Sequence, residues 1–314
     1  MKIVFLEPMG ISKKQLMEKV SAKVPACHEV VYYDNRVTDT ESLIERSKDA
    51  DVVVLSNFQY RKDVIEHCPN LKMICVAFTG VDHVDIEYCR ERGITVCNCA
   101  GYSTSAVADV VFAMVIDLAR NIVKCDEKCR YGGTKDGLVG FELEGKSFGV
   151  IGYGAIGKRV AHIAKAFGCK VYASNRSPKC DEGIIFTDTD TLLKTCDIVS
   201  VHVPQNKDTI GLIGEKELNM MKKSAILINT ARGPIVNEKA LTEALKNGTI
   251  AAAGIDVFDK EPPLDTSKEL LSLNNVIVTP HIAFATQQAF EKRADIIAEN
   301  IKSWIENNPQ NIVC

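Results

Sequence analysis

The sequence lacks the features that mark several large classes of protein. It has no basic run, because its 38 Lys and Arg residues are scattered among 41 Asp and Glu residues, and its formal net charge is -3. Such a balance argues against a surface that binds nucleic acid or an anionic membrane. The opening MKIVFLEPMG offers only four consecutive apolar residues before Glu7, too few for a signal peptide or a transmembrane helix. We therefore expect a cytoplasmic protein.

The cysteines do not form the pattern of a metal or disulfide protein. There are twelve of them, but no CxxC pair occurs and only six histidines are present as further ligands. Zinc sites usually combine closely spaced cysteine pairs with histidines. We expect free thiols in a reducing compartment and no metal site.

The chain does contain a regular alternation of short β-branched runs with helical segments. With 314 residues and 46% hydrophobic content, it is long enough for two cores. The alternation is typical of parallel βαβ units. We predict an α/β protein with two doubly wound lobes, Rossmann-like or flavodoxin-like, and a cleft between them. The strands expected in the first lobe are Lys2 to Leu6, Glu29 to Tyr33, Asp51 to Ser56, Lys72 to Ala77 and Ile94 to Cys97.

A long helical segment from Thr104 to Arg120 is predicted to connect the lobes, and the glycine-rich YGGTKDGLVG after it is a loop. Six strands are expected beyond it, the size of a dinucleotide-binding domain. A helix from Thr286 to Ile305 returns to the first lobe. We therefore assign residues 1–100 plus 285–314 to a discontinuous substrate domain and residues 101–284 to the cofactor domain. The six expected strands are Ser147 to Ile151, Lys170 to Ala173, Ile198 to Val203, Ala225 to Asn229, Ala252 to Val257 and Asn275 to Thr279.

One glycine motif carries specific chemistry. The predicted strand SFGVI runs directly into Gly152, Gly154 and Gly157, and a helical sequence follows. In a dinucleotide-binding turn the first glycine permits the tight turn, the second the approach of backbone to the pyrophosphate, and the third close packing of strand and helix. The helix then presents its positive dipole end to the phosphates. The intervening Tyr153, Ala155 and Ile156 belong to the same predicted cradle.

The next strand indicates which dinucleotide is bound. An acid at its end would bind the ribose hydroxyls of NAD, but this sequence has Asn175, Arg176 and Ser177 there. A neutral side chain followed by arginine accommodates a 2′-phosphate. The sequence therefore favours NADP over NAD, with a solvated loop arginine as the alternative.

Further along, the motifs resemble those of the D-isomer-specific 2-hydroxyacid dehydrogenase family. The matching stretches occur in the family's order over almost the whole chain, and AGYSTSAVAD and the segment around TPHIAFAT look most like the glycerate dehydrogenase and hydroxypyruvate reductase branch. They are GVDHVD, LEGKSFGVIGYGAIGKRVA, HVPQNKDTIGLI, LINTARGPIVNEKAL, AGIDVFDKEPP and TPHIA.

The resemblance implies three catalytic residues. Arg232 of TARG resembles the arginine that binds the substrate carboxylate, His281 of TPHIA the acid/base, and Glu261 the carboxylate behind it. Chemistry agrees, because hydride addition to a ketone needs a proton donor, and an imidazole titrates near neutral pH. A carboxylate fixes the ring tautomer, and a guanidinium offers a planar fork to a carboxylate. Each residue also has a purely structural alternative. Arg232 could be a surface turn residue, Glu261 a solvated acid and His281 a hydrogen-bonded core histidine.

Other contacts follow from the resemblance. Backbone amides of Thr79, Gly80 and Val81 are expected around the substrate carboxylate. We expect the residues that influence substrate choice to be Asn57, Phe58 and Phe78. Phe284 is expected either to limit the size of the pocket or to pack in a core. Asp256 is expected to accept a hydrogen bond from the nicotinamide amide, or to have a helix-capping or loop role instead. The remaining expected cofactor contacts are His202, Val203, Pro204, Thr209, Thr230 and Ala231.

These expectations define a function and its rivals. We predict reduction of a small 2-oxo acid, of the hydroxypyruvate or glyoxylate type, to the D-2-hydroxy acid by NAD(P)H, in a homodimer built on the cofactor domains. The same chemistry on a bulkier 2-oxo acid is the alternative. A 3-phosphoglycerate dehydrogenase is disfavoured because many carry an added regulatory domain. A corepressor-like dinucleotide sensor is the rival from another class.

Overall fold

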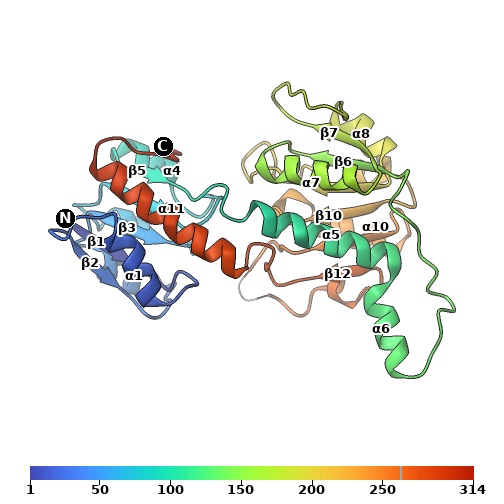
Figure 1. Ribbon diagram of the computed structural model, residues 1–314, viewed down its shortest axis with the longest axis horizontal. Coiled ribbons are helices and arrows are strands. Elements are labelled where there is room, and N and C mark those ends of the chain that lie inside the picture. The colour runs from blue at the N-terminus through green and yellow to red at the C-terminus, as the bar shows by residue number, and fades with distance from the viewer. Residues whose placement is uncertain (262–263) are drawn as a thin grey trace. The chain divides into compact units, whose positions relative to one another are not determined.

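The computed structural model describes residues 1–261 and 264–314, and the chain divides into two compact units. Unit 1 comprises Met1–Ser103 and Ala285–Cys314, and unit 2 comprises Thr104–Phe284. Each unit contains one parallel sheet covered by helices (Figure 1). The α/β class and the two doubly wound parallel sheets predicted from the sequence are confirmed.

Unit 1 has a five-stranded sheet in the order β2-β1-β3-β4-β5, with all strands parallel. This is the flavodoxin-like order, in which the chain changes direction between β1 and β3. All residues of β3 and β4 are buried, as expected for strands covered on both faces. The elements of unit 1 are β1 (Lys2–Phe5), α1 (Lys13–Ser21), β2 (Glu29–Tyr32), α2 (Thr40–Ser47), β3 (Val52–Leu55), α3 (Lys62–Ile65), β4 (Met73–Val76), α4 (Ile86–Glu91), β5 (Thr95–Cys97) and α11 (Gln287–Ile305).

Unit 2 has a seven-stranded parallel sheet in the order β12-β11-β10-β9-β6-β7-β8. Six of these strands, β8-β7-β6-β9-β10-β11, follow the Rossmann order, with the change of direction between β6 and β9, and β12 is added at the edge beyond β11. The elements are α5 (Thr104–Arg120), α6 (Ile122–Arg130), β6 (Ser147–Ile151), α7 (Ala155–Ala166), β7 (Lys170–Ser174), β8 (Ile184–Phe186), α8 (Thr189–Thr195), β9 (Ile198–Val201), α9 (Glu215–Met220), β10 (Ile226–Asn229), η1 (Gly233–Ile235), α10 (Glu238–Lys246), β11 (Ala252–Ile255), η2 (Glu269–Ser272) and β12 (Val276–Val278).

Two details of the predicted second sheet were wrong. The sheet has seven strands rather than six, because the three-residue strand β8 pairs with β7 at the edge. The strand predicted to end at Val203 ends at Val201, so His202 and Val203 belong to the loop beyond it. That loop lies where the change of direction between β6 and β9 opens a ligand site.

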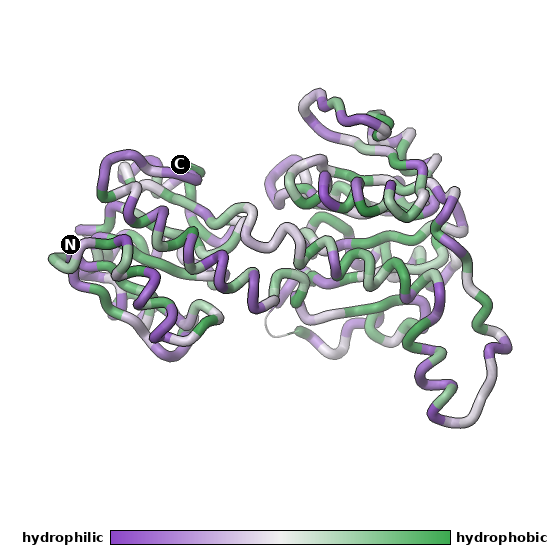
Figure 2. Tube along the Cα trace, in the orientation of Figure 1, coloured by the Kyte–Doolittle hydropathy of each residue, from purple (hydrophilic) through white to green (hydrophobic). Residues whose placement is uncertain are grey.

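Helices cover both faces of the second sheet. On one face α5 and α7 enclose a core that includes Val111, Phe148 and Val160, and on the other α8, α9 and α10 enclose one that includes Leu192, Leu227 and Leu241. In unit 1, α11 packs against α1, and Figure 2 shows hydrophilic and hydrophobic residues alternating along α11. This pattern is typical of a helix that buries one face.

Helix α6 is exposed on all sides. It contains no buried residue, and Figure 1 shows it and the loop after it extending away from the sheet of unit 2. Apolar side chains are exposed along this segment: Ile122 at 52%, Val123 at 64%, Tyr131 at 85% and Val139 at 84%. Isolated apolar residues are common on surfaces, and these four lie on one exposed segment.

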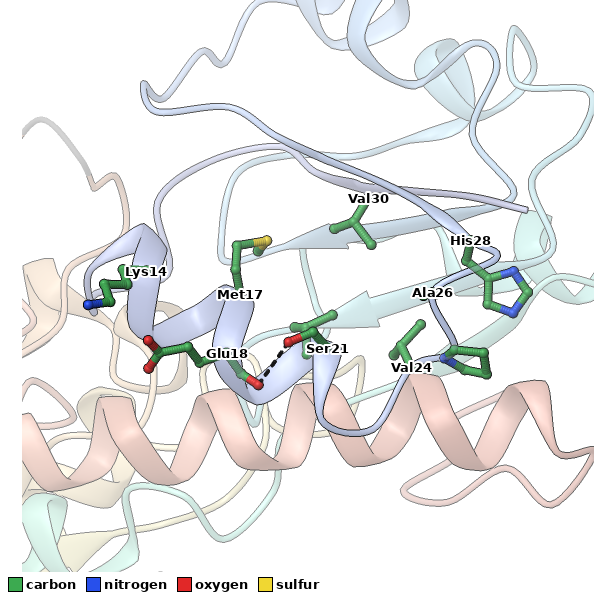
Figure 3. Close-up of a pocket in the computed structure, with 10 residues that line it drawn as sticks. Lys14, Met17, Glu18, Ser21, Val24, Ala26, His28 and Val30 are labelled. Atoms are coloured by element: carbon green, nitrogen blue, oxygen red, sulfur yellow. Dashed lines mark hydrogen bonds between the residues drawn. The ribbon is translucent and has the colours of Figure 1, made fainter.

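The described residues contain neither a membrane-spanning helix nor a metal-binding cluster. No helix within residues 1–261 and 264–314 combines the length and apolar character that crossing a membrane requires, and no cluster suited to a metal ion occurs in that part of the chain. All twelve cysteines are free thiols. A hollow of about 420 Å³ lies beside α1 (Figure 3), with Lys14 and Glu18 at one end and His28 at the other. Its charged and titratable side chains lie at opposite ends of the hollow and do not point toward a shared binding position.

Candidate active site

The candidate residues of unit 2 all follow strands of one sheet. Gly152 comes directly after β6, Asn175 after β7, His202 after β9, Thr230 after β10 and Asp256 after β11. Because the strands are parallel, their carboxyl ends share one edge of the sheet, and open α/β sheets bind their ligands at that edge. The fold therefore collects residues from more than a hundred positions of sequence on one side of unit 2.

The three glycines meet the geometric demands of a phosphate-binding turn. Gly152 has φ of +96°, and a Cβ there would lie 2.6 Å from the carbonyl oxygen of His202. A Cβ on Gly157 would lie 2.0 Å from the carbonyl oxygen of Gly152, so α7 packs close to β6. Gly154, the N-cap of α7, is exposed and has open space around its missing Cβ. The first turn of α7, with Ala155 and Ile156, is thus accessible to a pyrophosphate.

The loop after β7 is tied to this turn. The backbone N–H of Tyr153 donates to Oδ1 of Asn175 at 2.9 Å, and Nδ2 of Asn175 donates to the carbonyl of Ser177 at 2.8 Å. Asn175 therefore occupies the place where an acid would bind ribose hydroxyls, and the exposed Arg176 and Ser177 follow it. A neutral residue followed by a cation suits a phosphorylated ribose.

A second contact of the same loop was not predicted. Oδ2 of Asp181 accepts from the Tyr153 hydroxyl at 2.9 Å, and Lys158 and His162 each lie 3.0 Å from that oxygen. Hydrogen bonds from His162, Lys158 and Tyr153 hold the pKa of Asp181 well below its usual range. Burial, and then the Asp181 carboxylate, raises the pKa of Tyr153. Asp181 therefore anchors the loop on the glycine turn and on α7.

The loop after β9 forms the opposite side of the turn. Its His202 accepts or donates a hydrogen bond with Ser200 at 2.8 Å through Nε2, and burial lowers the pKa of its imidazole to about 3. His202 is therefore neutral near pH 7 and is not suited to donate a proton. Thr209 closes the loop, because its hydroxyl donates to the carbonyl of Pro204 at 2.6 Å. Val203 is partly buried against the core of unit 2.

Arg232 lies in a loop that the buried Asn229 holds. The side-chain oxygen of Asn229 accepts from the N–H of Ala231 at 3.1 Å, and its amide donates to the carbonyl of Arg232 at 2.9 Å. Arg232 itself donates to the Ala231 carbonyl at 2.8 Å through Nη1. Next to it, Thr230 carries a buried hydroxyl oxygen with no hydrogen-bond partner in the described residues. A buried polar atom without a partner is uncommon and indicates a place for a ligand.

Glu261 and His281 form a direct pair. Nδ1 of His281 lies 2.7 Å from Oε1 of Glu261, and each side chain is 19% exposed. Oε2 of Glu261 accepts from the backbone N–H of Phe258 at 3.1 Å. A carboxylate on Nδ1 fixes the tautomer and the orientation of the ring. The ring of Phe284 stands edge-on to the imidazole, with 5.4 Å between centroids.

The loop of Arg232 abuts the loop of Glu261. A Cβ on Gly233 would lie 2.1 Å from the carbonyl carbon of Phe258, so only glycine allows this approach. Phe258 is the residue whose N–H binds Glu261. A continuous set of contacts thus runs from the guanidinium loop to the imidazole. The sequence motifs around Arg232, Glu261 and His281 come together in one unit.

Asp256 holds the backbone of His281. Its Oδ1 accepts from the hydroxyl of Thr279 and, at 2.8 Å, from the N–H of Ile282, while Oδ2 accepts from the N–H of Ala283 at 3.0 Å. His281 has φ of +53°, a left-handed conformation that is rare for residues other than glycine. Burial raises the pKa of Asp256. Asp256 therefore stabilises the strained loop that presents the imidazole, in line with the loop role left open above.

Unit 1 contributes a separate row of backbone donors. The carbonyl of Phe78 accepts from the N–H of Cys99 at 2.9 Å, and the carbonyl of Thr79 from the amide of Asn98 at 2.8 Å. In a trans peptide the following N–H points away from the carbonyl, so the amides of Thr79 and Gly80 point away from these partners. Thr79 is exposed and Gly80 partly so.

The other predicted substrate contacts of unit 1 are engaged within it. Oδ1 of Asn57 accepts from Arg36 at 2.9 Å, and the same guanidinium donates to Glu7 at 2.8 Å. The rings of Phe58 and Phe78 are 4% and 5% exposed, so both pack in the interior. Asn57 is the one of these three side chains that lies at the surface of the unit.

Comparison with known proteins identifies the family. Residues 112–283, more than half of the chain, match the family model described as "D-isomer specific 2-hydroxyacid dehydrogenase, NAD binding domain". The chain belongs to this family. Its membership confirms the predicted class of oxidoreductase and a nicotinamide dinucleotide as cofactor.

Three relatives of this 2-hydroxyacid dehydrogenase chain cover nearly its full length. It is 38% identical to glyoxylate reductase of Thermococcus litoralis, over 98% of the chain and 97% of the relative. It is 36% identical to glycerate dehydrogenase of Methylorubrum extorquens, over 99% and 98%. A solved structure, an acyclic imino acid reductase (Bsp5) in complex with NADPH and D-Arg, superposes with a TM-score of 0.92 at 33% identity and covers 100% of both chains.

Proposed function

We propose that the protein reduces a small 2-oxo acid of the hydroxypyruvate or glyoxylate type to the D-2-hydroxy acid. The observation that carries this proposal is the pair of His281 and Glu261, 2.7 Å apart, on the sheet edge that also carries the glycine turn. A proton donor beside a dinucleotide cradle suits carbonyl reduction. The names of the relatives support the substrate class.

The residues at this edge fit a nicotinamide dinucleotide. Gly152, Gly154 and the N-terminus of α7 would hold the pyrophosphate, and the loop after β9 would line the adenosine side. The buried hydroxyl of Thr230 offers a partner at the nicotinamide side, as does Asp256, whose carboxylate has acceptor capacity beyond its three bonds. When bound, the reduced cofactor supplies the hydride that attacks the substrate carbonyl carbon.

The side chains of unit 2 supply the proton and the charge. Because Nδ1 of His281 is held by Glu261, Nε2 is the nitrogen that delivers a proton to the substrate oxygen as negative charge develops there. Glu261 stabilises the charged ring before transfer and keeps its orientation. Arg232 binds the substrate carboxylate with two parallel N–H groups and polarises the adjacent carbonyl.

We propose that unit 1 completes substrate binding through its backbone. The outward amides of Thr79 and Gly80 suit a carboxylate, and the adjacent amide of Val81 would be a third donor, because successive backbone N–H groups form anion-binding concavities. Asn57, at the surface of the unit, would contact the substituent beyond the carbonyl. Phe284, edge-on to His281, would limit the space beside the ring.

NADPH is the cofactor we propose as preferred. Asn175 offers no carboxylate to ribose hydroxyls, and Arg176 follows it on an exposed loop. An adjacent arginine attracts a 2′-phosphate that a carboxylate would repel.

The experiment that tests this function is a panel of 2-oxo acids assayed with NADH and NADPH in parallel. We expect glyoxylate or hydroxypyruvate to have the highest kcat/KM, with NADPH ahead of NADH. Higher values for phenylpyruvate or branched-chain acids would favour the bulkier substrate class. Tight NADPH binding without turnover of any acid would contradict the proposal and favour a dinucleotide sensor.

A second candidate reaction is the reduction of a 2-imino acid. The similarity to the structure named as an imino acid reductase favours testing it, since hydride attack on a protonated C=N bond needs the same cofactor geometry. The panel is therefore repeated with ammonia or an amine present. A kcat/KM that rises only with amine would identify this reaction.

We also propose a homodimer in which α6 is covered. The exposed Ile122, Val123, Tyr131 and Val139 support this, because such a patch is costly to leave in water. Light scattering that gives the mass of a monomer would refute it. The free thiol state of all twelve cysteines supports a cytoplasmic location.

A further inference from the structure

Arg293 of α11 is a charged residue in the interior of unit 1. It is 3% exposed, and its guanidinium donates to the carbonyl of Met9 at 2.6 Å and of Ala77 at 3.2 Å. Three aromatic rings surround it, with the guanidinium carbon 4.8 Å from the centroid of Phe290, 5.5 Å from that of Phe78 and 5.6 Å from that of Tyr102.

The positive charge has little compensation. Nε of Arg293 is buried without a hydrogen-bond partner in the described residues, and burial lowers the pKa of the guanidinium. The Tyr102 hydroxyl hydrogen-bonds the guanidinium and favours its charged form, but it is a neutral group. Glu7 also acts on Arg293 electrostatically, but the Glu7 carboxylate already accepts from Arg36 and from the N–H of Ser56. Burying a charge is expensive unless it is paired. Aromatic faces, two carbonyls and the Tyr102 hydroxyl reduce this cost but do not neutralise the charge.

The site of this charge is the base of the predicted carboxylate-binding loop. Arg293 holds the carbonyl of Ala77, Cys99 that of Phe78, and Asn98 that of Thr79. Three successive carbonyls, of Ala77, Phe78 and Thr79, are thus held by partners within unit 1. The N–H groups of the same peptides belong to Phe78, Thr79 and Gly80, and they consequently point away from these partners.

We propose that Arg293 is a positioning residue for the anionic substrate: it fixes the loop at Ala77 and Phe78, and its buried charge strengthens carboxylate binding at the amides of Thr79 to Val81. This inference rests on the proposed function and extends it to a residue outside the three catalytic motifs. The attraction acts through protein interior, where charges are weakly screened, so it contributes more than a surface arginine would.

The test compares Arg293→Met, Arg293→Lys and the control Arg92→Met. Arg92 also donates to two carbonyls, those of Ile65 at 3.4 Å and Cys68 at 3.3 Å, and packs on an aromatic ring. Both carbonyls precede β4, so they lie at the amino edge of the sheet. Each variant is assayed with the best 2-oxo acid and with its neutral primary amide, and oxamate is titrated by calorimetry into protein saturated with NADP⁺.

We expect Arg293→Met to raise KM for the acid roughly tenfold or more and to weaken oxamate binding by a similar factor. KM for the amide and for NADPH should change less than about twofold, because neither depends on this charge. Arg293→Lys, which keeps the charge, should stay within about threefold of the wild type. Arg92→Met should alter neither the ratio of KM for the acid to KM for the amide nor the dissociation constant of oxamate.

Equal losses for acid and amide, or unchanged oxamate affinity, would overturn the inference and leave Arg293 a structural residue. If Arg293→Met fails to fold, Arg293→Lys decides: a KM for the acid within about threefold of the wild type supports the inference, and a tenfold rise overturns it because the charge is retained. A wild-type protein that turns over no 2-oxo acid refutes the proposed function instead. In that case the oxamate titrations still decide whether Arg293 supports an anion site.

Discussion

Replacing Glu261 with Gln tests the pair at the centre of the mechanism. The carboxylate of Glu261 accepts from two donors, Nδ1 of His281 at 2.7 Å and the N–H of Phe258 at 3.1 Å. Glutamine has one acceptor oxygen and one NH₂ group. The variant can therefore satisfy one donor, and its NH₂ group faces the other.

The size of the effect follows from the charge that is removed. At 2.7 Å and an effective dielectric constant of about 20, a unit ion pair has an interaction energy of about 6 kcal/mol, which is a ceiling. Each side chain is 19% exposed, so water screens part of it, and an effective constant of about 40 to 80 leaves about 1.5 to 3 kcal/mol. This corresponds to a decrease of about 10- to 150-fold in kcat.

The assay follows NADPH oxidation with glyoxylate for Glu261→Gln, with Glu261→Asp as a control that keeps the charge on a shorter side chain. We expect kcat to fall and the dissociation constant of NADPH to stay within about twofold, because Glu261 acts on the proton donor. A Glu261→Gln variant with wild-type kcat would refute the assignment of the pair. A loss confined to NADPH binding would show that Glu261 supports the cofactor site instead.

Three further predictions concern the cofactor edge. Gly154→Ala should fold normally yet bind NADPH at least about tenfold more weakly, since its Cβ enters the open space of the cradle. Gly152→Ala should instead lower the free energy of unfolding by about 1 to 3 kcal/mol, because Gly152 has a positive φ and its Cβ would meet the His202 carbonyl. Thermal melts measure the loss of stability, and cofactor titrations measure the loss of NADPH binding. Arg176→Ala should raise KM for NADPH about tenfold or more and leave KM for NADH within about twofold, and equal changes would refute a 2′-phosphate contact. The imidazole of His202 has a pKa of about 3 in the folded protein, below its unfolded value of about 6.5, so its contribution to stability is complete above pH 6.5 and is lost as pH falls toward 3; by pH 5 it should be reduced by about 2 kcal/mol. Urea unfolding at pH 5 and pH 8 should show a smaller difference for His202→Asn than for the wild type.

The sheets could be predicted because their strands are buried on both faces. Parallel strands such as β3 and β4 are continuous apolar runs, and this pattern is visible without knowledge of tertiary structure. Strand β8 was missed because it has three residues at the sheet edge and only Ile184 is buried. Helix α6 was missed because it has no buried face, and hence no apolar stripe to detect.

The catalytic candidates came from motifs, but the contacts that support them did not. The spacing of the glycines predicts a turn whose geometry the structure shows at Gly152 and Gly157. By contrast, Asn229 is a single amide whose two partners depend on the path of the loop. The contact between Arg293 and Met9 joins residues 284 positions apart. Such pairs depend on tertiary packing, which local patterns do not contain.

The most direct measurement is the reduction of glyoxylate or hydroxypyruvate by NADPH in wild-type protein and in His281→Ala, with cofactor affinity measured for both. We expect steady turnover by the wild type, at least a hundredfold lower kcat in the variant, and an unchanged dissociation constant for NADPH. Full activity of His281→Ala would contradict this expectation, because the proton would then come from a different group.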